Sequence, residues 1–226
     1  MADSPITADQ ITGCLLAGGR GARMGGVDKG LQHFQGLPLA LHALQRLAPQ
    51  VGPLLINANR NTEQYLALGQ PLNAKVCADA LPDYPGPLAG FMAGIAQCQT
   101  PWLLCVPCDT PLFPLDLAAQ MIAARGDART DIIIAHGWDT ERAQPHQSPE
   151  LRAQPVFCLI RSSLKHSLEA FITSGGRKID AWTIQHHCAK AMFDRPGDEQ
   201  AFTNANTLAQ LHDLEQLAAD VPARNP

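Results

Sequence analysis

The chain reads "LLAGGRGARMGGVDKG" from residue 15 to residue 30, and this stretch decides how the fold is interpreted. It holds six glycines and follows directly on the first apolar run, "ITGCLL" (11–16). Glycine lets the backbone approach a ligand closely, and a row of exposed N–H groups forms a concavity that suits phosphate. Lys29 adds a positive charge, and Arg23 adds a fork of donors for phosphate oxygens. The stretch predicts a loop that binds a diphosphate or triphosphate; its glycine content alone would also fit a flexible turn.

Two well-known phosphate-binding loops do not fit this stretch. The P-loop requires Gly-Lys-Ser/Thr at its end, whereas Lys29 follows an aspartate and precedes a glycine. The dinucleotide fingerprint Gly-x-Gly-x-x-Gly can start at Gly19 and Gly21, but Met24 then stands where the third glycine belongs. The sequence therefore indicates a different kind of nucleotide-binding loop.

The composition describes a packed globular chain with a mildly acidic balance. Of the 226 residues, 46% are hydrophobic and 17% charged, and the net charge is -4, which argues against a nucleic-acid-binding protein. The start lacks the pattern of a signal peptide, and no window reaches the roughly 18 consecutive apolar residues of a membrane span. Seven cysteines without regular spacing indicate a reduced compartment. We expect a cytoplasmic protein that binds neither nucleic acid nor a membrane.

Short apolar runs alternate with helical patterns along the first 136 residues. The runs expected to form strands are 11–16, 53–58, 74–78, 102–107 and 131–136. The segments expected to form helices are 38–48, 61–68, 87–98 and 114–124. The apolar runs are unbroken, as in strands that are covered on both faces. This pattern predicts an α/β fold, namely a Rossmann-like, open, mostly parallel sheet with helices on both faces.

The later part of the chain does not continue this alternation of apolar runs and helical patterns. Residues 137–155 are polar and contain prolines, and we expect them to form a long loop. The elements expected after it are a strand at 156–160, helices at 161–173 and 177–183, a short strand at 190–193 and a helix at 207–218. We interpret 1–226 as a single domain, with a nucleotide-binding half (11–136), an acceptor-substrate half (137–218) and a tail (219–226).

Polar residues follow the strands of the first half. Asn57 comes at the end of the second strand, Asp79 after the third and Asp109 after the fourth. Because ligands of such sheets bind beyond the carboxyl ends of the strands, we expect these side chains to gather beside the glycine loop. Asp109 is a candidate Mg²⁺ ligand, since Mg²⁺ binds through one or two carboxylates plus substrate phosphates. The alternative is that Asp109 caps the helix that follows it.

Five motifs together resemble the molybdenum cofactor guanylyltransferase family. They are "LLAGGRGARMGGVDKG", "NANR", "DYPGPLAG", "PCDTP" and "FTNANT", in the family's order from residue 15 to about residue 210. The resemblance implies the nucleotidyltransferase fold. It also implies transfer of GMP from GTP to molybdenum-bearing molybdopterin with Mg²⁺, which gives the guanine dinucleotide form of the cofactor and pyrophosphate. Proteins that deliver or receive the cofactor would be partners, and we expect a monomer.

The resemblance also assigns roles to the matching positions. Those that would contact GTP are Leu16, Ala17, Gly18, Lys29, Asn57, Asp79 and Asp109. Gly19 and Arg23 belong to the same loop, and Lys29, Arg23 and Asp109 form the catalytic set, with Asp109 also as the metal ligand. Asn204 and Asn206 match asparagines of the pterin-substrate and catalytic side.

The base preference has its own hypothesis. Guanine presents N1–H and the N2 amine side by side, and a carboxylate such as that of Asp79 accepts both well, with help from Asn57. Adenine would leave the carboxylate unpaired. The alternatives are that Asp79 holds the ribose or only caps the following turn.

Three further interpretations remain open at this point. A cytidylyltransferase or a sugar-phosphate nucleotidyltransferase would use the same sheet. A zinc or redox module could use Cys105 and Cys108, a C-x-x-C pair, together with 186–188, which reads His-His-Cys. Arg177 and Lys178 could receive the pterin phosphate, although a solvated helix start explains them more simply.

Overall fold

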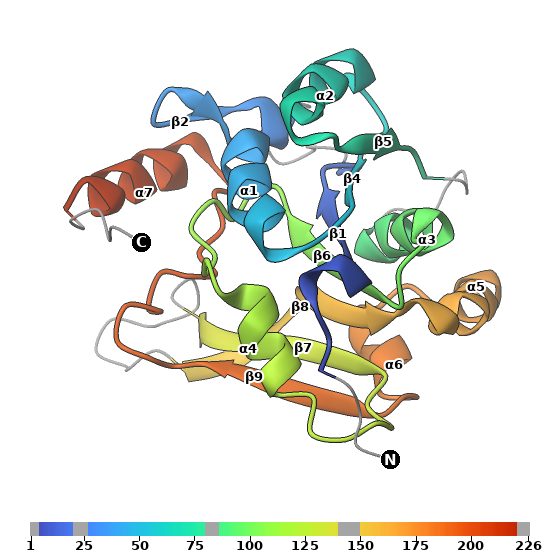
Figure 1. Ribbon diagram of the computed structural model, residues 1–226. Coiled ribbons are helices and arrows are strands. Elements are labelled where there is room, and N and C mark those ends of the chain that lie inside the picture. Colours follow the sequence, from blue (N-terminus) through green and yellow to red (C-terminus); the bar gives the residue numbers. More distant parts are fainter. Residues whose placement is uncertain (1–4, 20–26, 80–85, 140–149, 221–226) are drawn as a thin grey trace.

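A seven-stranded sheet forms the centre of the protein, in a computed structural model that describes residues 5–19, 27–79, 86–139 and 150–220 (Figure 1). The strand order is β5-β4-β1-β6-β8-β7-β9. The strands are β1 (Ile11–Leu16), β4 (Leu54–Asn57), β5 (Lys75–Cys77), β6 (Trp102–Pro107), β7 (Ile132–Asp139), β8 (Glu150–Arg161) and β9 (Cys188–Phe193). Within this sheet β8 runs antiparallel to both of its neighbours, and the other pairs are parallel. The prediction of an α/β, mostly parallel sheet is confirmed.

Helices cover both faces of the sheet (Figure 1). The face that bears α1 (Leu39–Leu47), α2 (Thr62–Gly69) and α4 (Leu117–Ala123) encloses one apolar cluster. The face that bears α3 (Pro87–Gln97), α5 (Lys165–Thr173) and α6 (Ile179–Thr183) encloses a second. Burial on both sides explains why the strands of the first half are unbroken apolar runs.

The prediction of a loop at 137–155 is wrong for those residues of the stretch that the structure describes. β7 continues to Asp139, and β8 already begins at Glu150, while 140–149 lie outside the described residues. The two strands pair in antiparallel register as far as Asp139 with Glu150, after a bulge between Ile134 and Ala135. Most residues of these ends are partly exposed, so polar side chains are compatible with a strand there. Because these ends carry no apolar run, their sequence did not predict strands.

Smaller differences occur near helix starts and ends. A short hairpin, β2 (His33–Phe34) and β3 (Leu37–Pro38), precedes α1, and its turn has positive φ at both central residues. Helix α4 begins at Leu117, three residues later than expected, and Asp116 occupies its N-cap position. Asp109 therefore does not cap this helix. The last helix, α7 (Leu208–Asp220), runs two residues into the segment expected as a tail.

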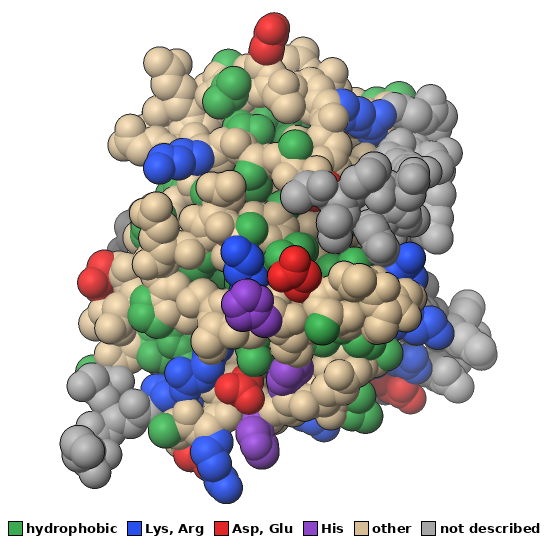
Figure 2. All heavy atoms as spheres, turned by 90° about the vertical axis from the view of Figure 1, so that its right-hand side faces the viewer, with side chains coloured by type: hydrophobic (Ala, Val, Ile, Leu, Met, Phe, Trp, Pro, Cys, Tyr) green, Lys and Arg blue, Asp and Glu red, His purple; other side chains and the backbone are tan. Residues whose placement is uncertain are grey.

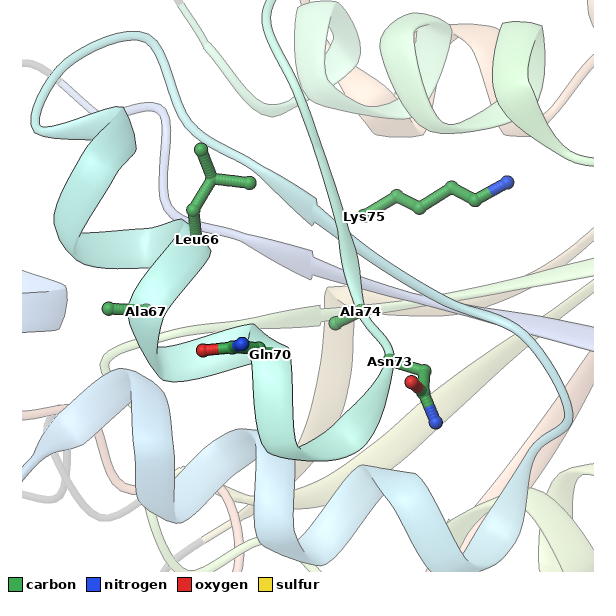
Figure 3. A pocket seen from close by; sticks show the side chains of 6 residues that line it. All are labelled: Leu66, Ala67, Gln70, Asn73, Ala74 and Lys75. Carbon is green, nitrogen blue, oxygen red and sulfur yellow. The ribbon is translucent and has the colours of Figure 1, made fainter.

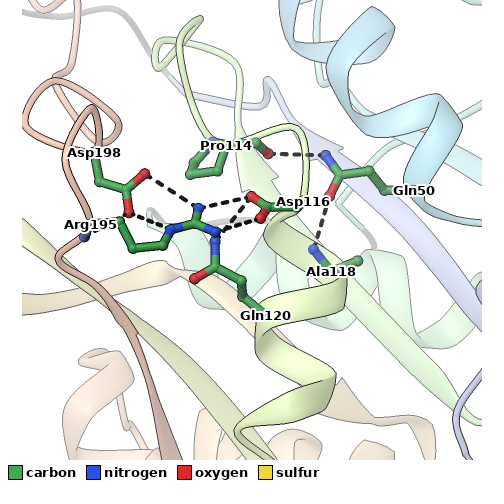
Figure 4. A network of polar contacts seen from close by, with 7 residues as sticks. All are labelled: Gln50, Pro114, Asp116, Ala118, Gln120, Arg195 and Asp198. Carbon is green, nitrogen blue, oxygen red and sulfur yellow. Dashed lines mark hydrogen bonds and ion pairs between the residues drawn. The ribbon is translucent and has the colours of Figure 1, made fainter. Parts of the chain in front are cut away.

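The segment 194–207 connects β9 to α7 and returns to the centre of the molecule. Arg195 makes two hydrogen bonds to the Asp116 carboxylate, at 2.7 and 3.1 Å, and pairs with Asp198 at 3.1 Å (Figure 4). Phe202 is buried and packs edge-on against Phe157 and Phe193. The segment is thus fixed by charge at its start and by aromatic packing further along.

The surface over α3, α5 and α6 carries mixed charge. Figure 2 shows Lys and Arg side chains on this face interspersed with Asp, Glu and His rather than gathered into one basic patch. Among the described residues, no helix has both the length and the apolar character that crossing a membrane requires.

Candidate active site

Strands β1, β4 and β6 bring their carboxyl ends to one edge of the sheet. Leu16 pairs with Asn57 on one side and with Pro107 on the other. Beyond the strands, the N–H of Ala17 donates to the carbonyl of Asn57 at 2.8 Å, and the N–H of Cys108 donates to the carbonyl of Leu16 at 3.1 Å. The chain leaves β1 toward β4 and β5 and later returns to β6 on the other side. The site therefore lies at the position where doubly wound sheets bind ligands.

Lys29 is the centre of a first group of site residues, the lysine cluster, formed by Lys29, Asp109 and Asn206. The Lys29 ammonium donates to the Asn206 side-chain carbonyl at 2.7 Å and lies 3.3 Å from the Asp109 carboxylate. Both charged side chains are about four-fifths buried, with exposed fractions of 21% and 19%. The cluster joins three motifs that are far apart in the sequence, and it leaves a cation and a carboxylate side by side at the edge of the sheet.

The 194–207 segment is bonded directly to the loop that follows β6. The Thr110 hydroxyl donates to the Asn204 side chain at 2.7 Å, and the N–H of Ala205 donates to the carbonyl of Asp109 at 2.8 Å. Asn204 and Asn206 thus lie on either side of a residue that is bonded to Asp109. Thr110 is fully buried, and its role in holding the segment was not expected from the sequence.

Asp79 is the centre of a second group, the asparagine–aspartate cluster, formed by Asn57, Asn59 and Asp79. The two carboxylate oxygens each accept one amide hydrogen, from Asn57 at 2.9 Å and from Asn59 at 2.7 Å. Asn59 also donates to the carbonyl of Gly18 at 3.2 Å and accepts from the N–H of Asp79 at 2.8 Å. Asn59 was missed as a site residue, although its spacing of two from Asn57 was a usable signal.

The asparagine–aspartate cluster depends on two close backbone approaches. A Cβ atom at Gly18 would lie 2.7 Å from the Asn59 amide nitrogen and 2.9 Å from the Asn57 amide oxygen. A Cβ atom at Gly90, in the first turns of α3, would lie 2.7 Å from the same Asn57 oxygen. A side chain at either glycine would therefore have to displace the asparagine side chains of the cluster.

The predicted loop residues are described only in part. Leu16, Ala17 and Gly18 contact Asn57 or Asn59 of the asparagine–aspartate cluster, and the carbonyl of Gly19 accepts from Arg60. Arg23 lies outside the described residues, so its expected contact with phosphate stays a prediction.

Asp109 has the chemistry of a Mg²⁺ ligand. The described residues contain no group of three or more His, Cys, Asp or Glu side chains that could hold a metal. Mg²⁺ needs no such group when substrate phosphates complete its shell, and a single carboxylate beside a phosphate-binding loop is a usual arrangement. The partly exposed Asp109 carboxylate fits this role.

The C-x-x-C pair does not form a common site. Cys105 belongs to the apolar cluster under α3 and α5, whereas Cys108 belongs to the cluster on the other face of the sheet. Burial raises the pKa of both thiols, which disfavours the thiolates that bind zinc. His186 contacts the Ser167 hydroxyl at 2.9 Å. These positions favour packing roles over the zinc or redox module.

Arg177 and Lys178 lie where α5 is followed by α6. The Arg177 guanidinium donates to the carbonyls of Gly176 at 2.9 Å and Ile172 at 3.3 Å, so it closes the end of α5. Lys178 is exposed at the N-cap position of α6. This arrangement corresponds to the simpler of the two interpretations, a helix start in solvent.

A hollow of about 600 Å³ lies between α2 and the start of β5 (Figure 3). It is lined by Leu66, Ala67, Gln70, Asn73, Ala74 and Lys75. The hollow lies beside the amino end of β5, whereas Asp79 follows the carboxyl end. It holds no carboxylate, so the site is identified by its chemistry and not by this concavity.

Comparison with known proteins agrees with the geometry. Residues 13–189 match the family described as the MobA-like NTP transferase domain. A molybdenum cofactor guanylyltransferase from Acidovorax ebreus (strain TPSY) is 57% identical over 94% of this chain and 98% of its own length. One from Bordetella petrii is 53% identical over 92% of this chain and 99% of its own length. The chain belongs to the molybdenum cofactor guanylyltransferase family. The resemblance found in the motifs is confirmed.

Solved structures support the fold. A molybdopterin-guanine dinucleotide biosynthesis protein A from Archaeoglobus fulgidus superposes with a TM-score of 0.68 at 22% identity, covering 93% of this chain and all of that one. A 4-diphosphocytidyl-2C-methyl-D-erythritol synthase from Anaerococcus prevotii reaches 0.70 at 9% identity, covering 94% and 99%. At such identities the likeness concerns the nucleotidyltransferase fold alone.

Proposed function

We propose that this family member transfers GMP from GTP to molybdenum-bearing molybdopterin and releases pyrophosphate. The observation that carries the proposal is the lysine cluster, in which one ammonium joins the glycine loop, the loop after β6 and the 194–207 segment. A site for group transfer between two substrates needs such a meeting point, because positioning and charge neutralisation supply most of the catalysis.

The reaction needs no nucleophile from the protein. A terminal phosphate oxygen of molybdopterin attacks the α-phosphorus of GTP, the new P–O bond forms, and the bond to the β-phosphate oxygen breaks with pyrophosphate as leaving group. Lys29 stabilises the negative charge that develops on the phosphates. Arg23 is proposed to assist from the same loop.

Mg²⁺ is the proposed cofactor, and Asp109 would hold it. When bound, it would neutralise phosphate oxygens and favour departure of pyrophosphate. Lys29 pairs with the same Asp109 carboxylate, which places the lysine within reach of the proposed phosphate region.

The asparagine–aspartate cluster is the proposed site of the nucleoside. Each Asp79 oxygen already accepts one amide hydrogen, and a carboxylate offers about four lone-pair positions, so two remain for the guanine N1–H and N2 amine. The pterin substrate is proposed to bind beside Asn204 and Asn206, which the 194–207 segment brings to Thr110 and Lys29.

The test is pyrophosphate release with each of ATP, CTP, GTP and UTP, with and without molybdenum-bearing molybdopterin. We expect release with GTP and only in the presence of the acceptor. Release with CTP instead would favour the cytidylyltransferase, and release with a sugar phosphate as acceptor would favour the other alternative. The Lys75→Ala variant, altered at a lysine beside the hollow, serves as the matched control and should keep full activity.

The cellular setting is part of the proposal. We propose that the protein acts in the cytoplasm as a monomer and exchanges its pterin with proteins that deliver or receive the cofactor. The seven cysteines are free thiols in the structure, which is compatible with a reduced compartment. Analytical ultracentrifugation of the purified protein would test whether it is a monomer in solution.

A further inference from the structure

The residue before Lys29 has a set of partners that the proposed reaction does not use. Asp28 is only 8% exposed. Its carboxylate accepts hydrogen bonds from the Tyr65 hydroxyl at 2.6 Å and from the Asn61 amide at 3.0 Å, and the Nε atom of Arg60 lies 3.5 Å away. All three partners belong to the segment that follows β4 and enters α2. A buried carboxylate is tolerated only with paired charge and hydrogen bonds, so this set fixes Asp28 in place.

Arg60 also bonds to the backbone at both described ends of the glycine loop. Its Nη2 atom donates to the carbonyl of Val27 at 3.0 Å and to the carbonyl of Gly19 at 3.4 Å. A guanidinium has five N–H donors in a planar fork, so one side chain can hold these carbonyls and the Asp28 carboxylate together. Arg60 therefore ties the loop ends to the segment that leads into α2.

Tyr65 contacts the residues on both sides of Lys29. Its side chain is completely buried, and a Cβ atom at Gly30 would collide with its hydroxyl oxygen. Burial raises the pKa of Tyr65, so the hydroxyl keeps its proton and remains a donor to Asp28. Asp28 and Gly30 are thus both held against the same ring.

The Lys29 side chain bonds to a different part of the molecule from the one that holds Asp28. Asp28 is held by the segment before and within α2, whereas the ammonium of Lys29 contacts Asp109 and Asn206. We propose that Tyr65 and Arg60 are positioning residues, which hold Asp28 and thereby direct Lys29 toward the triphosphate of the nucleotide. The inference rests on the proposed function, because it takes the triphosphate as the ligand of Lys29.

A double-mutant cycle with Lys29 tests the inference. Tyr65→Phe removes one oxygen and keeps the ring, and we expect kcat/KM for GTP to fall about tenfold, as for a lost hydrogen bond to a charged group. In a Lys29→Ala background the same substitution should change kcat/KM less than about twofold, since the lysine through which it acts is gone. Equilibrium binding of GTP should show the same non-additivity.

Two further variants separate positioning from general destabilisation. Asn61→Gly removes the second donor to Asp28, suits the left-handed backbone at this residue (φ +50°), and should repeat the pattern with a smaller effect. Thr12→Val is the control, because it breaks a partly buried hydroxyl pair with Thr100 (2.7 Å) at the opposite end of β1. This substitution should lower the melting temperature, and at temperatures below the melting transition kcat/KM should be unchanged.

The outcomes are distinguishable. Equal losses in the two backgrounds, or an unchanged kcat/KM in both Tyr65→Phe and Asn61→Gly, would overturn the inference and leave the proposed function standing. If Lys29→Ala alone keeps GTP affinity and turnover, the proposed role of Lys29 fails, and the inference fails with it.

Discussion

Two ion pairs of this protein have opposite characters. The pair between Lys29 and Asp109 is four-fifths buried but loose, with a single contact at 3.3 Å. The pair between Arg195 and Asp116 is about half exposed but tight, with two contacts to the same carboxylate, the shorter at 2.7 Å (Figure 4). The tighter pair also has a second acceptor, Asp198.

The difference agrees with the roles proposed for the two pairs, a structural one for Arg195 with Asp116 and a functional one for Lys29 with Asp109. A fork of donors bound to two carboxylates is saturated, so Arg195 has little capacity left for a ligand. The Lys29–Asp109 pair is largely removed from water but does not have the geometry of a strong ion pair. A more strongly charged group can therefore replace this contact. The triphosphate that we propose as the ligand of Lys29 is such a group.

The largest expected effect is that of Asp109→Asn. It keeps the shape of the side chain but removes the negative charge, and we expect turnover to fall on the order of 10²- to 10³-fold, as for loss of several kcal/mol of metal-assisted stabilisation. Pyrophosphate release across a range of Mg²⁺ concentrations measures it. Asp116→Asn is the matched control in the tight pair and should keep its activity; similar losses in both would break the comparison.

Lys29→Ala should have the next largest effect. A hydrogen bond to a charged group is worth about 1.5–3 kcal/mol, so kcat/KM for GTP should fall roughly 10- to 150-fold with the fold intact. Steady-state kinetics with circular dichroism provide the measurement. Kinetics equal to those of the parent in a folded variant would show that the loose pair is merely structural.

Asp79→Asn should act on selectivity more than on rate. Inosine triphosphate lacks the N2 amine, so the parent enzyme should prefer GTP and the variant should prefer it several-fold less. The comparison is the ratio of kcat/KM values for the two nucleotides. The same ratio in both proteins would move the choice of base from the Asp79 carboxylate to other groups.

Arg195→Ala should have the smallest effect. Exposed pairs contribute about 0.2–1 kcal/mol, so thermal stability should fall slightly, and activity per folded molecule should hold because Phe202 still anchors the segment.

The thermal stability lost in the Arg195→Ala variant should also depend on pH. Hydrogen bonding to Arg195 lowers the pKa of Asp116, so the pair stabilises the fold above the ordinary aspartate pKa of about 3.9. That contribution disappears as the pH falls through the lowered value. Melting temperatures of parent and variant should therefore converge as the pH falls into strong acid; a difference that stays constant as the pH falls would contradict the assignment.

The sequence predicted well those parts whose physics is local. Both faces of β1, β4 and β6 are buried, so their composition alone identifies them as strands of a parallel sheet. The same rule places Asn57 and Asp109 at one edge, because carboxyl ends of parallel strands coincide. Partly exposed or very short strands, such as the end of β7 and the hairpin at 33–38, have no apolar run that would identify them.

Contacts between distant segments were not predictable from composition. Nothing in the sequence shows that Tyr65 bonds to Asp28, 37 positions away, or that Thr110 bonds to Asn204. Asn206 was assigned to the site by resemblance alone, and its bond to Lys29 became visible only in three dimensions. The division into a nucleotide half and an acceptor half stays a prediction.

The bond between Lys29 and Asn206 spans 177 positions, which has a consequence for biosynthesis. Chains grow at roughly 5–20 residues per second, so Lys29 waits on the order of ten seconds or longer before its partner has been made. The nucleotide loop can fold early, but a nascent chain cannot assemble the complete lysine cluster during that time. Full activity should accordingly appear only after residue 206 has left the exit tunnel.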